Sequence, residues 1–139
     1  MSDARTLAIV KPDAFSGGKT GKIIAQLEGD GFRLVGGRVV RLDRERAEAF
    51  YAVHRGKPFF TSLVDFMTSG PVLALALERE DAVTRLRELI GATDPAEAAP
   101  GTVRALYAES KECNAIHASD SPENARLEVA FFFAEKDLT

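Results

Sequence analysis

The stretch TLAIVKP, residues 6–12, sets the first element of the fold. Residues 6–10 are a short apolar run. Lys11-Pro12 ends it, because a proline pushes the residue before it toward extended backbone. A short apolar run of this kind, bounded by a turn signal, is typical of a buried strand. The sequence therefore predicts a buried β-strand over residues 6–10.

Further strands are predicted at residues 32–42, 72–77 and 114–117. Gly36 and Gly37 indicate a bulge or a close backbone approach within the first of these. The run VLALAL, residues 72–77, would also fit a helix by periodicity alone, and its flanking proline and charges favour a strand.

Helices are predicted from the caps Thr20 and Asp43, over residues 60–67 and 80–90, and from the Ser121-Pro122 start. Four strands interleaved with helices imply a sheet covered by helices. The predicted fold class is α+β: a ferredoxin-like βαββαβ sandwich with a four-stranded antiparallel sheet covered by helices. At 139 residues the chain is expected to form a single domain, residues 1–139.

The composition limits the kinds of partner and site. With 45% hydrophobic residues the chain can build a core without staples, and a net charge of −3 gives no general attraction to nucleic acid or an anionic membrane. One cysteine and two histidines are too few for most structural metal sites. The sequence shows no signal-peptide pattern and no apolar run near the ~20 residues of a membrane span. We therefore expect a cytoplasmic protein that binds neither membrane nor nucleic acid.

The stretch DAFSGGKT, residues 13–20, resembles a phosphate-binding P-loop only at its end. That motif needs a glycine five positions before its Gly-Lys pair, and Asp13 occupies this position. A carboxylate there would repel phosphate, and its Cβ would crowd the turn. We interpret the stretch as a glycine loop that enters a helix.

One of the two histidines lies in NAIHASDSPENA, residues 114–125. A lone histidine after an apolar residue is more often structural. Here, however, His117 directly precedes a predicted helix start at Ser121, and a helix N-terminus is a ready anion site. Glu128 lies two turns into that helix, where its carboxylate would accept a hydrogen bond from one ring nitrogen and leave the other free to attack. On its sequence position alone, Glu128 is more simply interpreted as a solvated helix residue.

A set of cations could hold a polyphosphate that the net charge does not attract. Lys11 follows a predicted strand, and Arg87 and Arg104 flank the long loop 91–102, which contains Thr93. Each cation alone is most simply a solvated surface charge. Of the neighbours Phe59 and Phe60, one is expected in the core and the other outside it, as a stacking platform for a base.

Four stretches, in order, resemble the nucleoside diphosphate kinase family. NAIHASDS is similar to the family signature N-x-x-H-G-S-D-S, and TLAIVKPDA is similar to its first strand and Lys-Pro-Asp turn. FYAVHRGKPFFTSLVDFMTSGPV resembles its nucleotide-clamp helix pair, and GATDPAEAAPGTVR its long active-site loop. The similarity runs in register from residue 5 to residue 134.

The resemblance implies an enzyme that transfers the γ-phosphate of a nucleoside triphosphate (NTP), typically ATP, to a nucleoside diphosphate (NDP). It implies a ping-pong reaction through a pros-phosphohistidine at His117, Mg²⁺ bound mainly to the nucleotide phosphates rather than in a dedicated metal site, and a homo-oligomer, either tetramer or hexamer. The family's nucleotide-contacting positions correspond to Lys11, Tyr51, Phe59, Arg87, Thr93, Arg104 and Asn114.

The resemblance also gives these residues roles. Phe59 stacks on the base, which favours broad base tolerance because stacking reads no hydrogen-bonding edge. Lys11 and Asn114 bind the ribose hydroxyls and the nearby phosphate. The phosphates are held by Arg87, Thr93 and Arg104. Ser121 and Glu128 correspond to the pair behind the nucleophile, with Glu128 orienting the imidazole; Lys11, Ser121 and Glu128 thus join His117 as catalytic candidates.

Two departures from the family pattern leave alternatives open. Ala118 stands where the family has glycine, and at a positive φ an alanine would cost roughly 1 kcal/mol and press on the incoming phosphate. At an ordinary φ, which we favour, the swap is nearly silent. VRALYAES lacks the family's Arg-Gly-Asp-Phe-like run but keeps Arg104, which predicts altered loop packing. The rivals are a nucleotide-binding scaffold inactivated at Ala118 and, against the acidic balance, a nucleic-acid-binding regulator.

Overall fold

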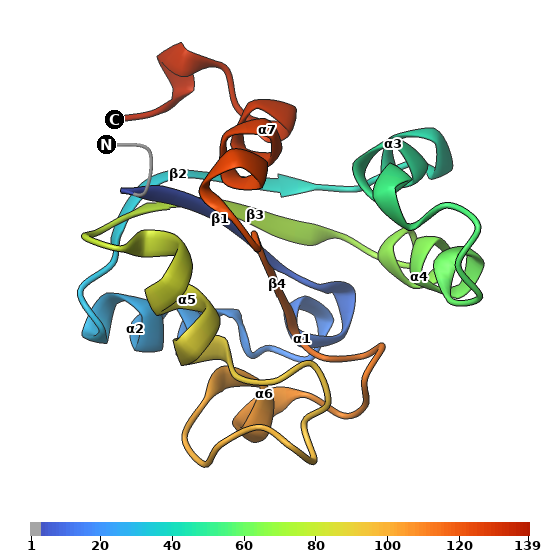
Figure 1. Cartoon of the computed structure of the whole chain (residues 1–139), viewed down its shortest axis with the longest axis horizontal. Helices are drawn as coiled ribbons and strands as arrows, with labels where there is room; N and C mark the ends of the chain where they lie inside the picture. Colours follow the sequence, from blue (N-terminus) through green and yellow to red (C-terminus); the bar gives the residue numbers. More distant parts are fainter. Residues whose placement is uncertain (1–3) are drawn as a thin grey trace.

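The computed structural model describes residues 4–139, and within them one four-stranded antiparallel sheet lies at the centre (Figure 1). Its strands are β1 (Arg5–Val10), β2 (Arg33–Val40), β3 (Val72–Glu78) and β4 (Ile116–Ala118), and their spatial order is β2-β3-β1-β4. All three pairings are antiparallel. The predicted ferredoxin-like α+β fold is confirmed by this order, which places β1 and β3 in the interior of the sheet.

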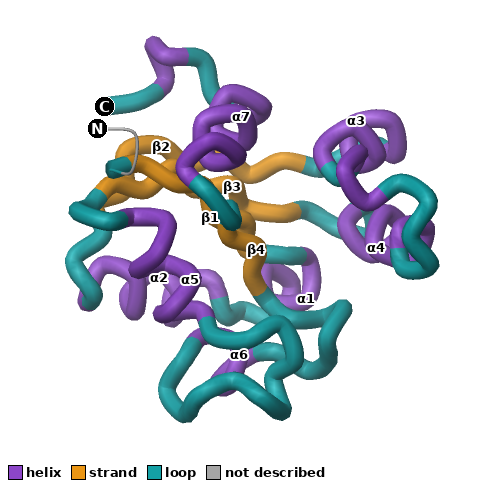
Figure 2. The backbone as a smooth tube through the Cα atoms, in the orientation of Figure 1, coloured by secondary structure: helices purple, strands orange, loops and turns teal. Residues whose placement is uncertain are grey.

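Helices cover both faces of the sheet. The helices are α1 (Pro12–Ser16), α2 (Thr20–Gly29), α3 (Arg44–Phe50), α4 (Phe60–Met67), α5 (Ala82–Ile90), α6 (Val103–Tyr107) and α7 (Pro122–Phe132), with 3₁₀ turns η1 (Ala52–His54) and η2 (Glu135–Asp137). In Figure 1, α7 lies above the sheet and α2 and α5 below it. Figure 2 shows the pair α3 and α4 beyond the ends of β2 and β3, and long loops gathered around α6.

The central strand is apolar throughout because each of its faces meets a different core. Leu7 and Ile9 pack with α4 and α7 residues on one side, and Ala8 and Val10 pack with α2 and α5 residues on the other. Fully burying a Leu or Ile side chain contributes about 1.5–3 kcal/mol. A strand with helices on both faces therefore loses the polar alternation of a half-exposed one, as the apolar run of residues 6–10 predicted.

Most of the predicted helix and strand signals are found in place. Asp43 caps α3, with its Oδ1 accepting from the Arg46 amide at 2.8 Å, and Pro122 opens α7. The pairing register of β2 shifts between Leu34 and Gly36, which is the predicted irregularity. A Cβ on Gly36 would lie 2.9 Å from Leu138 Cδ2, so it is a side chain, rather than another backbone, that approaches this glycine closely.

Three local predictions were wrong or incomplete. The N-cap of α2 is Lys19, whose backbone is already helical, so Thr20 is a helical residue rather than a cap, and its hydroxyl caps nothing. β4 begins at Ile116 rather than at Asn114, because residues 114 and 115 form a turn. Helices α1 and α6 have five residues each, too few to show a helical period in sequence.

Candidate active site

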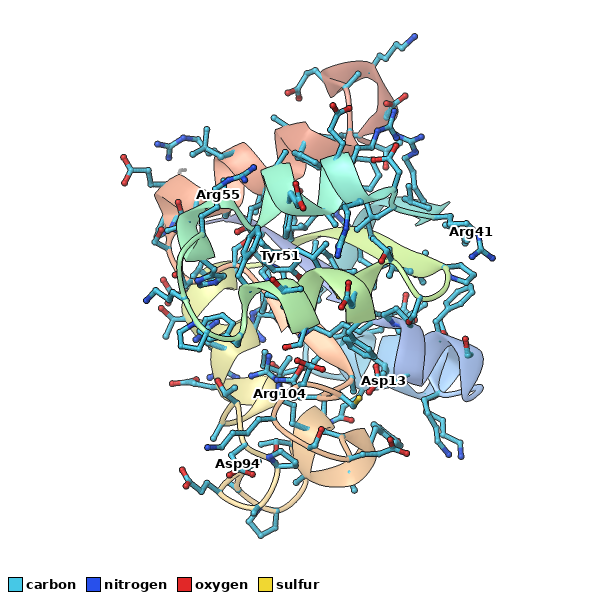
Figure 3. The ribbon with its side chains drawn as sticks, turned by 90° about the vertical axis from the view of Figure 1, so that its right-hand side faces the viewer. Asp13, Arg41, Tyr51, Arg55, Asp94 and Arg104 are labelled. Atoms are coloured by element: carbon cyan, nitrogen blue, oxygen red, sulfur yellow. The ribbon has the colours of Figure 1, made fainter. Side chains whose placement is uncertain are left out.

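A cavity of about 690 Å³ opens where β4, the end of β1, the α3–α4 pair and the long loops meet. It is lined by every site residue that the sequence predicted except Ser121. Figure 3 views the molecule from the side of α3 and α4, with Tyr51 between their ribbons and Arg104 below α4. Residues from positions 11 to 128 thus meet in one place, which the sequence order alone does not show.

His117 lies on β4, opposite Ile9 of β1, and its ring contacts α7. Its Nε2 lies 2.8 Å from Glu128 Oε1. Because a carboxylate only accepts hydrogen bonds, we assign the ring proton to Nε2, which leaves the lone pair on Nδ1. The predicted orienting contact of Glu128 is therefore present, and Nδ1 is the nitrogen left free for chemistry.

The serine behind this pair is Ser119, and the pairing of Ser121 with Glu128 was wrong. Ser119 Oγ donates to Glu128 Oε1 at 2.6 Å, whereas Ser121 Oγ accepts from the Asn124 amide at 3.1 Å as the N-cap of α7. The cap position turns the Ser121 hydroxyl toward the helix N-terminus. The sequence did hold a signal for Ser119: in extended backbone, residues two apart point to the same side, so Ser119 follows His117.

Aromatic rings form the wall beside His117. The ring of Phe50, which the sequence did not single out, lies 5.3 Å from the imidazole, and that of Tyr51 lies 6.1 Å away, both edge to face. Burial, with a smaller effect of Glu128, raises the pKa of the Tyr51 hydroxyl well above its usual range, so it stays protonated. This hydroxyl is buried, and no partner for it is found among residues 4–139. Such a donor is available to a ligand.

One side of the cavity carries the cations Lys11, Arg87 and Arg104, which are held by neutral oxygens. Lys11 Nζ donates to Asn114 Oδ1 at 2.8 Å, Arg104 Nη2 donates to the Ile116 carbonyl at 2.7 Å, and Arg87 Nη1 donates to the Ala118 carbonyl at 3.1 Å. None of the three cations forms an ion pair within the described part of the chain. Their charge is therefore available to an anion.

Burial changes the acidity of two of these cations. Lys11 is only 6% exposed, and burial, together with the nearby Arg104, lowers its pKa to about 8. Burial and the charge of Arg87 lower the pKa of Arg104 to about 10. An anion bound among these groups would restore favourable charge pairing at each of them.

The first residues of the long loop are hydrogen-bonded to this side of the cavity. Asn114 Nδ2 donates to the Thr93 carbonyl at 3.2 Å, and Arg104 Nη1 donates to the Gly91 carbonyl at 3.1 Å. Gly91 has a φ of 88°, and a Cβ there would lie 2.5 Å from Thr102 Oγ1, so the loop can leave α5 only through glycine. Thr93 itself is exposed at the cavity edge.

The backbone strain in this region lies at Ala115, not at Ala118. Ala118 lies in β4 without a positive φ, as we favoured from the sequence, so its methyl replaces a glycine hydrogen without strain. Ala115 has a φ of 76°, and the Ile116 amide donates to the Asn114 carbonyl at 2.9 Å, which forms a γ-turn. No sequence signal marks an alanine for this conformation.

The clamp side of the cavity is formed by α3, η1 and α4. Phe59 is 44% exposed while Phe60 packs against the core, so the predicted division of this pair is confirmed. His54, outside the predicted site, also lines the cavity, with its ring 5.2 Å from that of Phe59 and 6.2 Å from that of Tyr51. Burial, then Lys57 and His117, lower the pKa of His54.

Comparison with known proteins agrees with this geometry. The family model for nucleoside diphosphate kinase matches residues 4–138. The chain belongs to the nucleoside diphosphate kinase family. It is 54% identical to a nucleoside diphosphate kinase of Nitratiruptor sp. over 134 residues, 96% of this chain and 98% of the relative. It is also 54% identical to that of Hyphomonas neptunium, covering 100% of this chain and 99% of the relative.

Solved structures of the family share the fold. Aquifex aeolicus nucleoside diphosphate kinase superposes with a TM-score of 0.96 at 49% identity, covering 98% of this chain and 99% of that one. The enzyme of Halobacterium salinarum, in complex with CDP, gives 0.94 at 45% identity, covering 99% and 91%. The predicted enzyme class, a phosphotransferase of this family, is thereby confirmed.

Two features are absent from residues 4–139. No helix there is long and apolar enough to cross a membrane. No group of three or more His, Cys, Asp or Glu side chains there is arranged to hold a metal ion.

Proposed function

We propose that this enzyme transfers the γ-phosphate of an NTP, typically ATP, to an NDP through a phosphohistidine on Nδ1 of His117. The observation that carries the proposal is the 2.8 Å contact between His117 Nε2 and Glu128 Oε1, inside a cavity whose three cations form no ion pair with residues 4–139. That contact holds the imidazole in one tautomer and orientation, which is how an enzyme activates a nitrogen nucleophile.

The reaction has two balanced halves. His117 Nδ1 attacks the γ-phosphorus of the NTP, the bond from that phosphorus to the β-phosphate oxygen breaks, and the first NDP leaves. The second NDP then attacks with a terminal phosphate oxygen, the N–P bond breaks, and Nδ1 regains its lone pair. Lys11, Arg87 and Arg104 stabilise the negative charge that spreads over the transferred group.

The remaining site residues position the nucleotide in this proposal. Phe59, at the exposed end of the cavity, stacks on the base and supports broad base tolerance, since stacking reads no base edge. Asn114, paired with Lys11, serves the ribose hydroxyls, and Thr93 at the cavity edge serves the phosphates. The protonated Tyr51 hydroxyl is a donor beside His117.

Mg²⁺ enters this scheme as part of the nucleotide substrate. The cavity offers cations and an amide on its phosphate side, a donor set that suits an anion already carrying its own metal. Mg²⁺ keeps several waters and is often held through substrate phosphates rather than by an all-protein cage. It would neutralise phosphate charge, while Lys11 and the arginines orient the transferred group.

The wider context of the enzyme follows from the family. We propose that residues 1–139 act as one domain and that the chain forms a homo-oligomer, tetramer or hexamer. Leu34 and Val39 support this, because they are exposed apolar side chains on the edge strand β2. A cytoplasmic location stays a prediction.

The direct test is labelling with γ-³²P-ATP and Mg²⁺. Acid-labile, base-stable label on His117 in the wild type, and none in His117→Gln, is the expected result. Transfer of the label to added NDP completes the ping-pong cycle. An unlabelled wild type that still binds NDP would support the inactive scaffold instead, and equal NTP exchange by His117→Gln would exclude His117 as the nucleophile.

A further inference from the structure

The Lys-Pro-Asp turn after β1 and the turn before β4 are joined by three hydrogen bonds. The Lys11 amide donates to the Ala115 carbonyl at 2.9 Å, and the Ala115 amide donates to Asp13 Oδ2 at 3.1 Å. Lys11 Nζ donates to Asn114 Oδ1 at 2.8 Å. Both backbone polar groups of Ala115 are therefore held by residues 11 and 13, about a hundred positions away in sequence.

These bonds hold a backbone conformation that alanine disfavours. Ala115, with its φ of 76°, is fully buried and is the central residue of the γ-turn. Such conformations persist only where the surrounding structure imposes them. Here the side-chain contribution to that constraint comes from Asp13, which accepts the Ala115 amide.

The turn at Ala115 determines the positions of the Asn114 side chain, the Ile116 carbonyl and the start of β4. It directs the Asn114 side chain toward Lys11 and presents the Ile116 carbonyl to Arg104 Nη2 at 2.7 Å. It also ends directly before β4, which begins at Ile116, one residue before His117. In Figure 3, Asp13 and Arg104 are both labelled below the ribbon of α4.

We propose that Asp13 is a positioning residue of phosphoryl transfer, which holds the Ala115 turn through its carboxylate and keeps a negative charge beside Lys11. The proposal rests on the phosphotransfer function of His117 given above. Asp13 lines no part of the cavity described, so it acts through Ala115 and Lys11 and not by contact with substrate.

The charge part of the proposal concerns every group that faces Lys11. Burial and Arg104 lower the pKa of Lys11, while Asp13 and then Cys113 and Glu112 raise it. Asp13 has the largest effect in the raising direction, and its Oδ1 is buried with no partner found in the described residues. Removal of this carboxylate alone therefore lowers the pKa of Lys11 further, below about 8.

Two substitutions separate the two actions. Asp13→Asn keeps an acceptor for the Ala115 amide but loses the charge, and Asp13→Ala loses both. Asp13→Asn is expected near wild-type at pH 6.5, with the alkaline loss of His117 phosphorylation shifted to lower pH. In Asp13→Ala the phosphorylation rate is expected to fall about 10–100-fold at every pH, because the reacting groups lose their alignment. In both variants kcat changes more than KM.

The experiment is single-turnover phosphorylation of His117 by ATP between pH 6 and 9.5, with melting temperatures for each variant. Asp137→Asn and Asp137→Ala are matched controls, because Asp137 Oδ2 accepts the Ala134 amide at 2.9 Å in η2, away from the cavity. These controls are expected to match the wild-type pH profile. If Asp13→Ala does not fold, the pH profile of Asp13→Asn decides.

The outcomes are distinct. A wild type that never labels His117 overturns the function itself. A labelled wild type with an Asp13→Asn profile on the wild-type curve, and an Asp13→Ala rate reduced only by its unfolded fraction, overturns the role of Asp13. A shifted alkaline limb in Asp13→Asn, absent in both Asp137 variants, supports it.

Discussion

The two walls of the cavity are built in opposite ways. On the phosphate wall, Lys11, Arg104 and Asn114 are buried and held by hydrogen bonds of 2.7–3.2 Å. On the clamp wall, Val53 and Phe59 are exposed, and the rings there meet only edge to face or stacked. Preorganised donors stabilise a transition state because they need no rearrangement during reaction. Under the proposed function, a loosely held aromatic surface accommodates different bases, and the chemistry and the base tolerance belong to different walls.

The largest effect is expected from Lys11→Met, which tests whether the buried cations of the phosphate wall serve the reaction rather than the fold. We expect the single-turnover rate of His117 phosphorylation to fall about 10²–10³-fold, because one preorganised charge is lost from the transferred phosphate. The melting temperature should stay equal or rise, since a buried ammonium is replaced by an apolar side chain of similar length. A melting temperature that falls together with activity would show that Lys11 serves the fold.

Glu128→Gln tests the contact that orients His117, the proposed nucleophile. The amide keeps the shape but can also donate to Nε2, which moves the ring proton to Nδ1 and removes the lone pair that attacks. We expect a loss of about 10²-fold in phosphorylation rate with little change in nucleotide affinity. Ser119→Ala should show a smaller loss of the same kind.

Ser121→Ala should instead lower the free energy of unfolding by about 1 kcal/mol, because the N-cap hydrogen bond of α7 is lost, and urea unfolding measures this.

Phe59→Ala tests the clamp wall. Loss of base stacking is expected to raise KM about tenfold for purine nucleotides and less for pyrimidines, with kcat nearly unchanged. Steady-state kinetics with GDP, ADP and UDP as acceptors measures this. Phe60→Leu is the control for the neighbouring core position, and its effect should appear in the melting temperature instead. A fall in kcat for Phe59→Ala would mean that the clamp also aligns the phosphates.

Sequence reasoning reached the parts of this molecule that depend on local pattern. The apolar runs at residues 6–10 and 72–77 predicted strands that are covered on both faces. The helix caps at Asp43 and Ser121 were predicted from the residues next to them. The resemblance to the family motifs named residues that line the cavity. What it could not supply depends on contacts between distant segments. Ser119 was missed in favour of Ser121, because only the packing of α7 against β4 shows which hydroxyl meets Glu128.

The same limit explains the backbone strain. Positive φ was considered at Ala118 because the family pattern has glycine there, yet it lies at Ala115, where Lys11 and Asp13 hold both backbone groups. No pattern within residues 114–118 distinguishes these two alanines. The two alanines differ in φ because Lys11 and Asp13, in the turn after β1, hydrogen-bond to the backbone of Ala115.

Ala118→Gly is the smallest expected effect and the most direct test of that distinction. Because Ala118 lies in extended backbone, is 3% exposed and presents its carbonyl to Arg87, glycine should leave phosphorylation within about twofold of wild type. Glycine in a strand costs about 0.5–1 kcal/mol of stability, so the midpoint of urea unfolding should fall slightly. A large rise in phosphorylation rate would show that the Ala118 methyl presses on the incoming phosphate. The phosphate wall would then be less well preorganised than its hydrogen bonds indicate.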